Sequence, residues 1–453
     1  MLLWLAACSP SDGPPSEEPA GWSAEPLDLL VLGQRLVRSG PVAASEVVCT
    51  AETDPTERHV VDGSAETVEL YGLLADTAYR CEIAAGDAVD VVTFRTEPLP
   101  EWLPSWHLEE ADGDGAYTIF NHGTDERNAR EAKILVVDPE GRLRWYYDVP
   151  YDAADLDVSF LGDGEVLYGG GYAAPPTVID LAGTVLLRAV DVDVYHHHAE
   201  QLDDGTFVAL TIDPNTDGSA EWTGMEIEIL DPAMTETVWS WRTQRGIDEG
   251  WLEAPLAGDD PYHMNSVAVL ADAVYPSFRN AEAVVKLDRS TGDRVWTLGP
   301  EGDFTLLDAL GAPADAAEWF YGAHAPEHDG DRILFHDNGF RRPGERTTRI
   351  VEMVIDEAAL TARVAWEYTE PGWYEPIWGD VDRLENGHVL YTRAHCGTCL
   401  PDDPSTTEIA ELDPETLSVV WRLVMDDVHD AGYRAERIDG CAIFANARYC
   451  AAL

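Results

Sequence analysis

Short runs that alternate apolar and polar residues recur along the chain from about residue 25, and turn-forming residues separate them. A period of two residues predicts strands with one buried face. The proline-rich stretch "RTEPLPEWLPSW" divides these runs into two groups. The sequence therefore predicts an all-β fold with two domains, at residues 25–98 and 99–453, behind an N-terminal segment of residues 1–24.

The first group of runs, residues 25–98, includes "TVELYGL", "YRCEIAAG" and "VDVVTFRT" and predicts a small β-sandwich. Tyr79 stands two residues before Cys81, which is the spacing of a tyrosine corner. Cys49 lies where a partner strand would pair with Cys81. The segment resembles an immunoglobulin-like or fibronectin-III-like domain, and it contains no catalytic motif.

The second group of runs repeats one pattern: a β-run, an aspartate that starts a turn, and a second β-run that usually ends in an aromatic residue. The turn aspartates are Asp138, Asp180, Asp231, Asp288, Asp356 and Asp413. A second hairpin with an Asp-Gly or Asn-Gly turn, as in "ENGHVLYTR", alternates with the first. Two hairpins make a four-stranded sheet, and six such sheets predict a six-bladed β-propeller, in which each blade covers the face of the next.

The charge of the chain is strongly negative, with 29 basic residues against 85 acidic ones and a formal net charge of −56. Such a surface disfavours nucleic acid and anionic lipid as partners and suits solubility. An anionic substrate must therefore be received by a local cluster of arginine and histidine.

The N-terminus, "MLLWLAACSPSDGPPSEEPAGW", resembles the lipobox of a bacterial lipoprotein, in which Cys8 becomes the lipidated first residue. The other reading is an ordinary frayed terminus. No later segment is apolar for long enough to span a bilayer. We therefore expect an exported periplasmic or cell-surface lipoprotein, held to the membrane only through a lipid on Cys8.

The remaining cysteines support export, because they fall into three pairs by position, as suits disulfides in an oxidising compartment. They are Cys49, Cys81, Cys396, Cys399, Cys441 and Cys450. The "CGTC" at 396–399 would also suit a redox pair or half of a zinc site. Because no second CxxC is present, we favour a structural disulfide there.

Histidines occupy comparable places in successive repeats, and the repeat symmetry brings four of them toward one axis. They are His197, within the run His196–His198, then His263, His324 and His395. Such a cluster suits a metal ion, although Arg341 and Arg342 follow His324 and would repel a cation. It also suits an oxyanion held by imidazolium and guanidinium groups, with one neutral imidazole as nucleophile. Arg341 fits the second arrangement.

Three stretches carry a family resemblance, in the order "HMNSVAVLADAVYPSFRNAEAVVKLDRSTGDRVWTLGP", "HAPEHDGDRILFHDNGFRR" and "GDVDRLENGHVLYTRAHCG". They resemble the bacterial arylsulfate sulfotransferases, over roughly residues 130 to 440 and most strongly from 260 to 395. The resemblance implies a six-bladed periplasmic propeller that moves a sulfuryl group from a phenolic sulfate ester to a phenol. The family needs no nucleotide donor and works by a ping-pong mechanism through a sulfohistidine intermediate.

The resemblance also implies residue roles: His263, His324 and Arg341 would grip the sulfate, and His395 would be the nucleophile. The pair Cys396/Cys399 is displaced relative to His395 when set against the family's disulfide, which leaves His429 as a substitute nucleophile. His197 is an alternative to His263. Further substrate contacts are expected from His197, Asn265, Arg279 and Tyr321, the last within an aromatic run, Trp319–Tyr321, that would wall an aryl pocket.

The expected enzyme is thus an arylsulfate sulfotransferase that uses no cofactor and no metal ion, with a small aryl sulfate donor and a phenolic acceptor as its partners. Two other functions remain open from the residues. One is a non-catalytic, surface-anchored propeller that binds a ligand. The other is a metalloenzyme with histidine ligands.

Overall fold

The computed structural model describes residues 21–27, 30–39, 44, 46–124, 132–151, 155–162, 164–171, 174–190, 194–213, 224–253, 260–396, 399–400 and 405–450. The chain divides into two compact units, one of Met1–Pro98 with Ala445–Leu453 and one of Leu99–Phe444. The sequence places the residues after 444 in the larger domain, whereas the described part of that stretch groups with the smaller unit.

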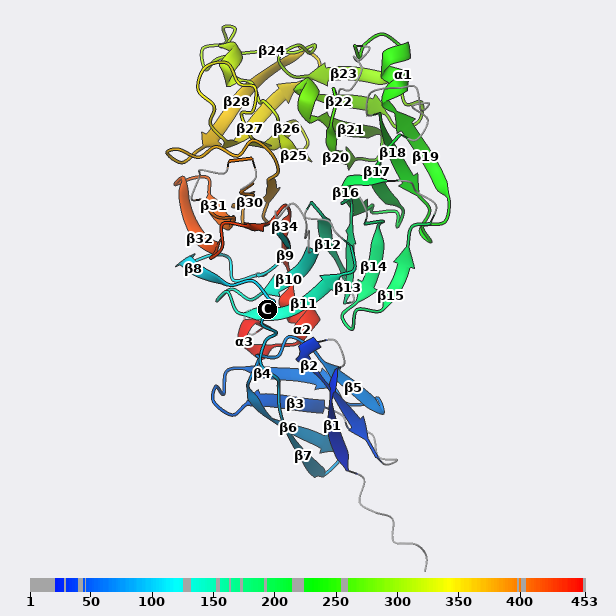
Figure 1. Cartoon of the computed structure of the whole chain (residues 1–453), viewed down its shortest axis with the longest axis vertical. Coiled ribbons are helices and arrows are strands. Elements are labelled where there is room, and N and C mark those ends of the chain that lie inside the picture. The colour runs from blue at the N-terminus through cyan, green and yellow to red at the C-terminus, as the bar shows by residue number, and fades with distance from the viewer. Residues whose placement is uncertain are drawn as a thin grey trace, which may run out of the picture. The chain divides into compact units, whose positions relative to one another are not determined.

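The smaller unit consists of two antiparallel sheets (Figure 1). One sheet has the order β1-β2-β5 and the other β4-β3-β6-β7. The bounds are β1 (Trp22–Leu27), β2 (Leu30–Arg38), β3 (Glu46–Ala51), β4 (Arg58–Asp62), β5 (Thr67–Leu70), β6 (Ala78–Ala85) and β7 (Ala88–Arg95), with helix α3 (Ala447–Cys450) at the C-terminal end. Buried residues of both sheets share one apolar cluster, in which Leu36 and Leu70 of the first sheet meet Val47 and Ile83 of the second. The two sheets therefore form the expected sandwich.

A disulfide and a tyrosine fix the centre of this sandwich. Cys49 and Cys81 lie opposite each other on β3 and β6 and form a disulfide, so the predicted pairing is confirmed. The bond joins neighbouring strands of one sheet, whereas the conserved disulfide of antibody domains joins the two sheets. The Tyr79 hydroxyl accepts a hydrogen bond from the backbone N–H of Leu74 at 2.9 Å. The predicted tyrosine corner is therefore present.

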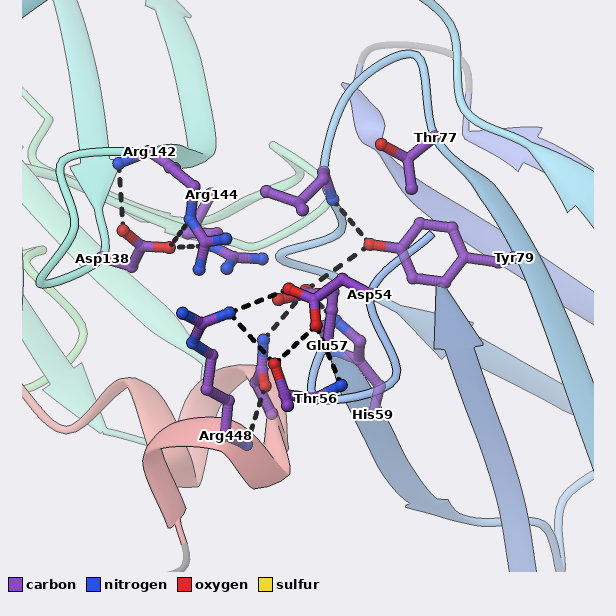
Figure 2. Close-up of polar contacts among 12 residues, drawn as sticks. Asp54, Thr56, Glu57, His59, Thr77, Tyr79, Asp138, Arg142, Arg144 and Arg448 are labelled. Atoms are coloured by element: carbon purple, nitrogen blue, oxygen red, sulfur yellow. Dashed lines mark hydrogen bonds and ion pairs between the residues drawn. The ribbon is translucent and has the colours of Figure 1, made fainter. Parts of the chain in front are cut away.

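The C-terminal segment completes the smaller unit through a buried carboxylate (Figure 2). Glu57 and His59 are fully buried, and Glu57 Oε1 lies 3.0 Å from His59 Nε2. The same oxygen accepts a hydrogen bond from Asn446 Nδ2 at 3.0 Å. Arg448 adds an ion pair with Asp54 at 2.9 Å. Burying a carboxylate requires such partners, so the last helix stabilises the unit that begins the chain.

The larger unit holds six sheets in its described residues. The first sheet contains β9 (Tyr117–Thr124), β10 (Ala132–Val137), β11 (Leu143–Val149), β33 (Asp430–Ala431) and β34 (Ala435–Ile438), and the second contains β12 (Asp157–Gly162), β13 (Glu165–Gly169), β14 (Thr177–Asp180) and β15 (Val185–Arg188). The third contains β16 (Tyr195–Gln201), β17 (Phe207–Ile212), β18 (Met225–Leu230) and β19 (Thr237–Arg242), and the fourth contains β20 (Met264–Val269), β21 (Ala273–Phe278), β22 (Ala283–Asp288) and β23 (Arg294–Leu298). The fifth contains β24 (Thr305–Leu306), β25 (His324–Asp329), β26 (Arg332–Asp337), β27 (Arg349–Asp356) and β28 (Thr361–Tyr368), and the sixth contains β29 (Asp380–Arg383), β30 (Val389–Arg393), β31 (Glu408–Asp413), β32 (Ser418–Met425) and β8 (Trp106–Ala111). Short helices α1 (Thr243–Asp248), η1 (Arg279–Ala281), η2 (Ala316–Glu318) and α2 (Gly440–Phe444) connect or follow them. All pairings are antiparallel except that of β24 with β28.

These sheets are arranged in a ring (Figure 1). The inner strands contact one another in succession: β12 with β16, β16 with β20, β20 with β25, and β25 with β29. Strand β34 contacts both β30 and β12, which closes the ring. The second strand β17 is buried at five of its six positions, whereas the outer strand β15 is exposed at three of four. Each sheet thus covers its neighbour and leaves only its outer edge to water.

Both ends of the larger unit take part in this closure. Strands β33 and β34 add the innermost position to the sheet of β9, and β8 adds a fifth, outer strand to the sheet of β32. Residues about 300 positions apart in sequence are therefore neighbours in one sheet, for example Ala435 and Phe120. The repeat pattern predicts six sheets but not this exchange of strands.

The predicted turn aspartates all cap turns at the end of the third strand of a sheet. Asp138 accepts hydrogen bonds from the N–H groups of Glu140 and Arg142, both at 3.0 Å, and also pairs with the buried Arg144 (Figure 2). The other five accept backbone hydrogen bonds in the same way: Asp180 from Thr184, Asp231 from Thr235, Asp288 from Ser290, Asp356 from Ala358 and Asp413 from Glu415. Aspartate suits this position because its side chain replaces a backbone acceptor in the turn.

Cys396 and Cys399 form a disulfide, as predicted. Cys8 and the side chains of Cys441 and Cys450 lie outside the described residues, so those predictions have no structural counterpart. Across the described part of the chain, the helices are too short or too polar to cross a bilayer.

Candidate active site

Three of the predicted histidines begin the inner strands of consecutive sheets. His197 lies near the start of β16, His263 directly precedes β20, and His324 is the first residue of β25. Consecutive sheets repeat the same strand order, so these starts lie at one end of the ring. The structure brings two of the side chains together, with His197 Nε2 at 3.2 Å from His263 Nε2. Of the four histidines predicted to converge, His197 and His263 are in direct contact.

The backbone has a positive φ angle at the start of each of these three strands. His197, His263 and Ala325 have φ angles of 58°, 44° and 44°, a region that side chains other than glycine rarely adopt. The strand register is irregular at the same points. A bulge at the start of an inner strand turns the next side chain away from the regular alternation. Strain of this kind recurs at functional sites, where packing holds it in place.

Three imidazoles form the centre of the cluster, those of His196, His197 and His263. Their ring centroids lie 4.0 to 5.2 Å apart. Each Nδ1 faces an oxygen: His196 donates to Met264 O at 2.9 Å, His197 lies 3.3 Å from Asp155 Oδ2, and His263 pairs with Asp260. Burial, followed by the neighbouring His196 and His263, holds the pKa of His197 well below its usual value.

His324 lies beside this group and is held by an amide. It is 1% exposed, and its Nδ1 lies 2.7 Å from Asn338 Oδ1. Asn338 directly follows β26, the second strand of the same sheet. Burial, followed by the charge of Arg279, lowers the pKa of His324 well below 6.5. The imidazole is therefore neutral at neutral pH.

Two arginines lie near His324 at different depths. Arg279 is 7% exposed and donates to Pro376 O at 2.7 Å and to Asn280 Oδ1 at 2.8 Å. Arg341 is exposed, donates to Asn280 O at 2.6 Å, and lies with its guanidinium 5.6 Å from the Phe340 ring. Arg279 therefore belongs to the buried centre, and Arg341 to its rim.

A third arginine comes from the closing strand. Arg434 immediately precedes β34 and is 8% exposed. It donates to Asp380 Oδ1 at 2.7 Å and lies 3.7 Å from Asp157 Oδ1. The neighbouring Tyr433 packs its ring 5.4 Å from that of His197. The cluster is thus completed by the last strand of the ring, which reaches the centre from the C-terminal end.

The structure places the other predicted residues elsewhere. His395 follows β30, so it lies at the same end of the ring but one strand farther from the centre, with Nδ1 at 4.0 Å from Glu375 Oε2. His429 is exposed in a turn. Tyr321 is 7% exposed, lies in the apolar core between sheets, and donates to Ala316 O at 3.0 Å. The aromatic run therefore packs in the core and does not reach the histidines.

Asn265 supports the cluster through the backbone. It is fully buried, donates to Ala323 O at 2.9 Å, and its own carbonyl accepts from the Tyr433 hydroxyl at 3.4 Å. The hydrogen bond to Ala323 fixes the residue that precedes His324. Asn265 thus positions neighbouring strands and makes no described contact with the imidazoles.

Several members of the site are not predicted from the sequence, namely His196, Asp155, Asp260, Asn338, Tyr433 and Arg434. One signal for Arg434 is present in the chain: "RAE" at 434–436 repeats the spacing of "HAE" at 198–200, at the same point of an inner strand. The carboxylates had no local signal, because acidic residues are common throughout this sequence.

Comparison with known proteins places the chain in a family. Similar solved structures include the β-propeller domain of Cps50 (Swd1) from Myceliophteria thermophila, at 9% identity over 70% of this chain and 88% of that one, with a TM-score of 0.36. A nidogen–laminin complex matches at 10% identity over 71% and 97%, with a TM-score of 0.38. Hsv2 from Kluyvelomyces marxianus matches at 10% over 88% and 99%, with a TM-score of 0.32. These TM-scores are too low to support a conclusion about this chain.

No curated protein matches the sequence. The family model Arylsulfotransferase (ASST), by contrast, matches residues 108–434, which include every histidine of the cluster as well as Arg279 and Arg434. The chain therefore belongs to the arylsulfotransferase (ASST) family and is an arylsulfate sulfotransferase.

Proposed function

We propose that this protein transfers a sulfuryl group from an aryl sulfate to a phenol by a ping-pong mechanism, with the Nε2 atom of His324 as nucleophile. The observation that carries the proposal is the hydrogen bond of 2.7 Å between His324 Nδ1 and Asn338 Oδ1, within a buried group of imidazoles. Family membership supplies the reaction class. The geometry supports the roles given to the residues.

Asn338 decides which nitrogen of His324 carries the hydrogen. Its Nδ2 donates to the carbonyl oxygens of Glu375, at 2.9 Å, and Trp378, at 2.8 Å, which fixes the orientation of the amide. The Oδ1 atom must therefore accept, and the Nδ1 of His324 must donate to it. The Nε2 atom of a neutral His324 then keeps its lone pair, as a nucleophile requires.

Arg279 provides positive charge for the sulfate, and it acts electrostatically on His324. The Nε2 atoms of His197 and His263 lie 3.2 Å apart, and both Nδ1 atoms of this pair face carboxylates. A fixed charge such as that of Arg279 stabilises the negative charge of the sulfuryl oxygens in the transition state.

The two half-reactions balance without an added reagent. In the first, Nε2 of His324 forms a bond to sulfur, the bond from sulfur to the aryl oxygen breaks, and the aryloxide takes up a proton. In the second, the oxygen of an acceptor phenol loses its proton and attacks sulfur, and the nitrogen–sulfur bond breaks. The proton that the aryloxide takes up in the first half-reaction is returned when the phenol loses its proton in the second.

The test is a donor assay on the wild type beside two matched variants, His324→Asn and His395→Asn. With 4-nitrophenyl sulfate and phenol, the wild type and His395→Asn release nitrophenol, whereas His324→Asn does not. Without phenol, the wild type releases a single burst equal to one nitrophenol per chain. His395 remains a predicted nucleophile from the sequence, and loss of the burst in that variant alone would establish it instead.

The same assay separates an enzyme from a binding module. Release of nitrophenol by neither the wild type nor the His395→Asn variant, across a panel of sulfate donors and phenols, would favour the non-catalytic alternative. Folding of each variant is checked by thermal unfolding.

We further infer that the ring of six sheets is a six-bladed β-propeller and that the smaller unit is an immunoglobulin-like sandwich.

We also propose that the protein is exported and lipidated at Cys8. The disulfides Cys49–Cys81 and Cys396–Cys399 support export, because such bonds persist in oxidising compartments. Incorporation of a labelled fatty acid by the wild type but not by Cys8→Ser tests the lipid.

A further inference from the structure

We propose that His196, His197 and His263 form a site for one divalent transition-metal ion, with Zn²⁺ as the best match. A metal ion held by histidines is one of the alternatives that the sequence leaves open. The proposal goes beyond the sulfuryl transfer described above, because it does not involve His324 as a ligand. Three protein nitrogens leave a fourth tetrahedral position for water or for an anionic oxygen of a substrate.

The spacing of His197 and His263 suits two ligands of a tetrahedral ion. One nitrogen of each histidine lies within 4.8 Å of the other two, and the Nε2 atoms of His197 and His263 are 3.2 Å apart. Zinc binds imidazole nitrogen at about 2.0–2.1 Å, so two ligands at the tetrahedral angle are about 3.3 Å apart. The observed separation is therefore that of two ligands of one ion. His196 and His197 are 1% and 3% exposed, which shields the position from bulk water.

The outer nitrogens have the partners that metal-binding histidines have. The Nδ1 atoms face Met264 O, Asp155 Oδ2 and Asp260 Oδ2. Metal-ligating histidines almost always donate the other ring N–H to a carboxylate or a carbonyl oxygen, which sets the tautomer and the ring orientation. Here all three rings share this pattern, and the Nε2 atoms of His197 and His263 face each other.

A divalent ion would use all three rings, whereas a single proton between His197 and His263 joins only two. The His196 ring stands 4.0 Å and 4.9 Å from the centroids of the other two. The charge of the ion is balanced by the carboxylates of Asp155 and Asp260, and the nearest arginine of the closing strand, Arg434, is already paired with Asp380.

The test measures metal binding and needs no turnover. The full chain is stripped with a chelator, then titrated with Zn²⁺, and the bound metal is counted by elemental analysis. Co²⁺ is used as a second probe, because tetrahedral Co²⁺ with nitrogen ligands absorbs strongly in the visible range. The wild type is expected to bind one ion per chain and to develop this absorption.

Two variants show which residues hold the ion. His196→Gln should weaken Zn²⁺ binding by more than about 100-fold, since loss of an outer partner alone costs 10–100-fold. Asp260→Asn, which removes such an outer partner, should weaken binding by about 10–100-fold. His328→Gln, on the neighbouring inner strand β25 with its ring packed against Tyr275, is the matched control and should bind like the wild type.

The proposal is overturned if the folded wild type binds no ion at 100-fold excess Zn²⁺, or if it binds one with no Co²⁺ absorption band. It is also overturned if His196→Gln binds as tightly as the wild type, because the metal then lies on the acidic surface. The result does not depend on the sulfuryl transfer: the burst assay reports on His324 whether or not a metal is bound.

Discussion

Each unit of the protein buries histidine beside carboxylate. The two groups differ in whether the carboxylate lies at the centre of the group or outside it. In the smaller unit, Glu57 is surrounded by His59, Asn446 and the Tyr79 hydroxyl, at 3.0, 3.0 and 3.5 Å from one oxygen. All three partners face the same carboxylate oxygen, Glu57 Oε1. The group therefore contributes to stability.

In the ring, the carboxylates stand outside the imidazoles. Asp155 and Asp260 each hold an outer nitrogen, and the inner nitrogens of His197 and His263 face each other. Burial of histidine beside carboxylate is thus common to both units. What distinguishes the candidate site is the convergence of several rings on one point, beside the neutral His324.

The largest expected effect comes from removing the carboxylate of Glu57 in the smaller unit. Glu57→Ala leaves His59 and Asn446 without their buried acceptor and should lower the free energy of unfolding of the smaller unit by about 3–5 kcal/mol. Thermal unfolding measures this loss, with Glu66→Ala at an exposed position as control. Sulfuryl transfer should be unchanged below the unfolding transition. A loss of activity without a loss of stability would show that the smaller unit takes part in catalysis.

The next effect concerns Arg279, beside the histidine cluster of the larger unit. Arg279→Gln should lower kcat/KM by about 10²–10³-fold, because it removes a buried charge beside the reacting sulfur. Steady-state kinetics with 4-nitrophenyl sulfate measures the change. Unchanged kinetics in a folded Arg279→Gln protein would show that the guanidinium does not bind the sulfate.

Stability in mild acid tests the neutral histidines. Burial lowers the pKa of His328 and of His336 to about 4, and that of His324 well below 6.5. Below pH 6.5 the unfolded chain binds protons at these residues and the folded chain does not, so stability must fall as the pH drops. Each residue contributes about 1.4 kcal/mol per pH unit between pH 6.5 and 5.

His328→Gln isolates one such contribution. Its free energy of unfolding should depend less steeply on pH than that of the wild type, by about 1.4 kcal/mol per unit. Chemical denaturation at several pH values measures both slopes. Equal slopes would mean that His328 is protonated in the folded protein.

The smallest expected effect is at the rim. Arg341 is exposed and paired only with a backbone oxygen in the described contacts, so its charge is screened by water. Arg341→Gln should lower kcat/KM by less than about tenfold, and the effect should shrink with added salt. An effect larger than that of Arg279→Gln would reverse the order of the two arginines and support the role that the sequence gives to Arg341.

Local patterns predicted the features that depend on neighbours in sequence. The turn aspartates from Asp138 to Asp413 and the disulfide of Cys396 with Cys399 are of this kind. The recurrence of histidine at the start of inner strands also follows from the repeat. These features require only that each sheet resemble the next.

The remaining features depend on contacts between distant parts of the chain. Strand β34 pairs with β9 across about 300 residues, so the match of "RAE" to "HAE" does not by itself place Arg434 at the site. The sequence does not predict the role of Asn338, because that role depends on the carbonyl oxygens of Glu375 and Trp378, which the fold brings near it. The position of His395 one strand farther out is likewise set by the order of strands within its sheet.

The central claim is that His324 carries the sulfuryl group. The direct measurement is peptide mapping by mass spectrometry of wild-type protein quenched after exposure to 4-nitrophenyl sulfate without phenol. The account predicts one added sulfuryl group on the peptide that contains His324, which disappears when phenol is supplied. A sulfuryl group on a peptide that contains His395 or His429, or none on any histidine while turnover proceeds, would contradict it.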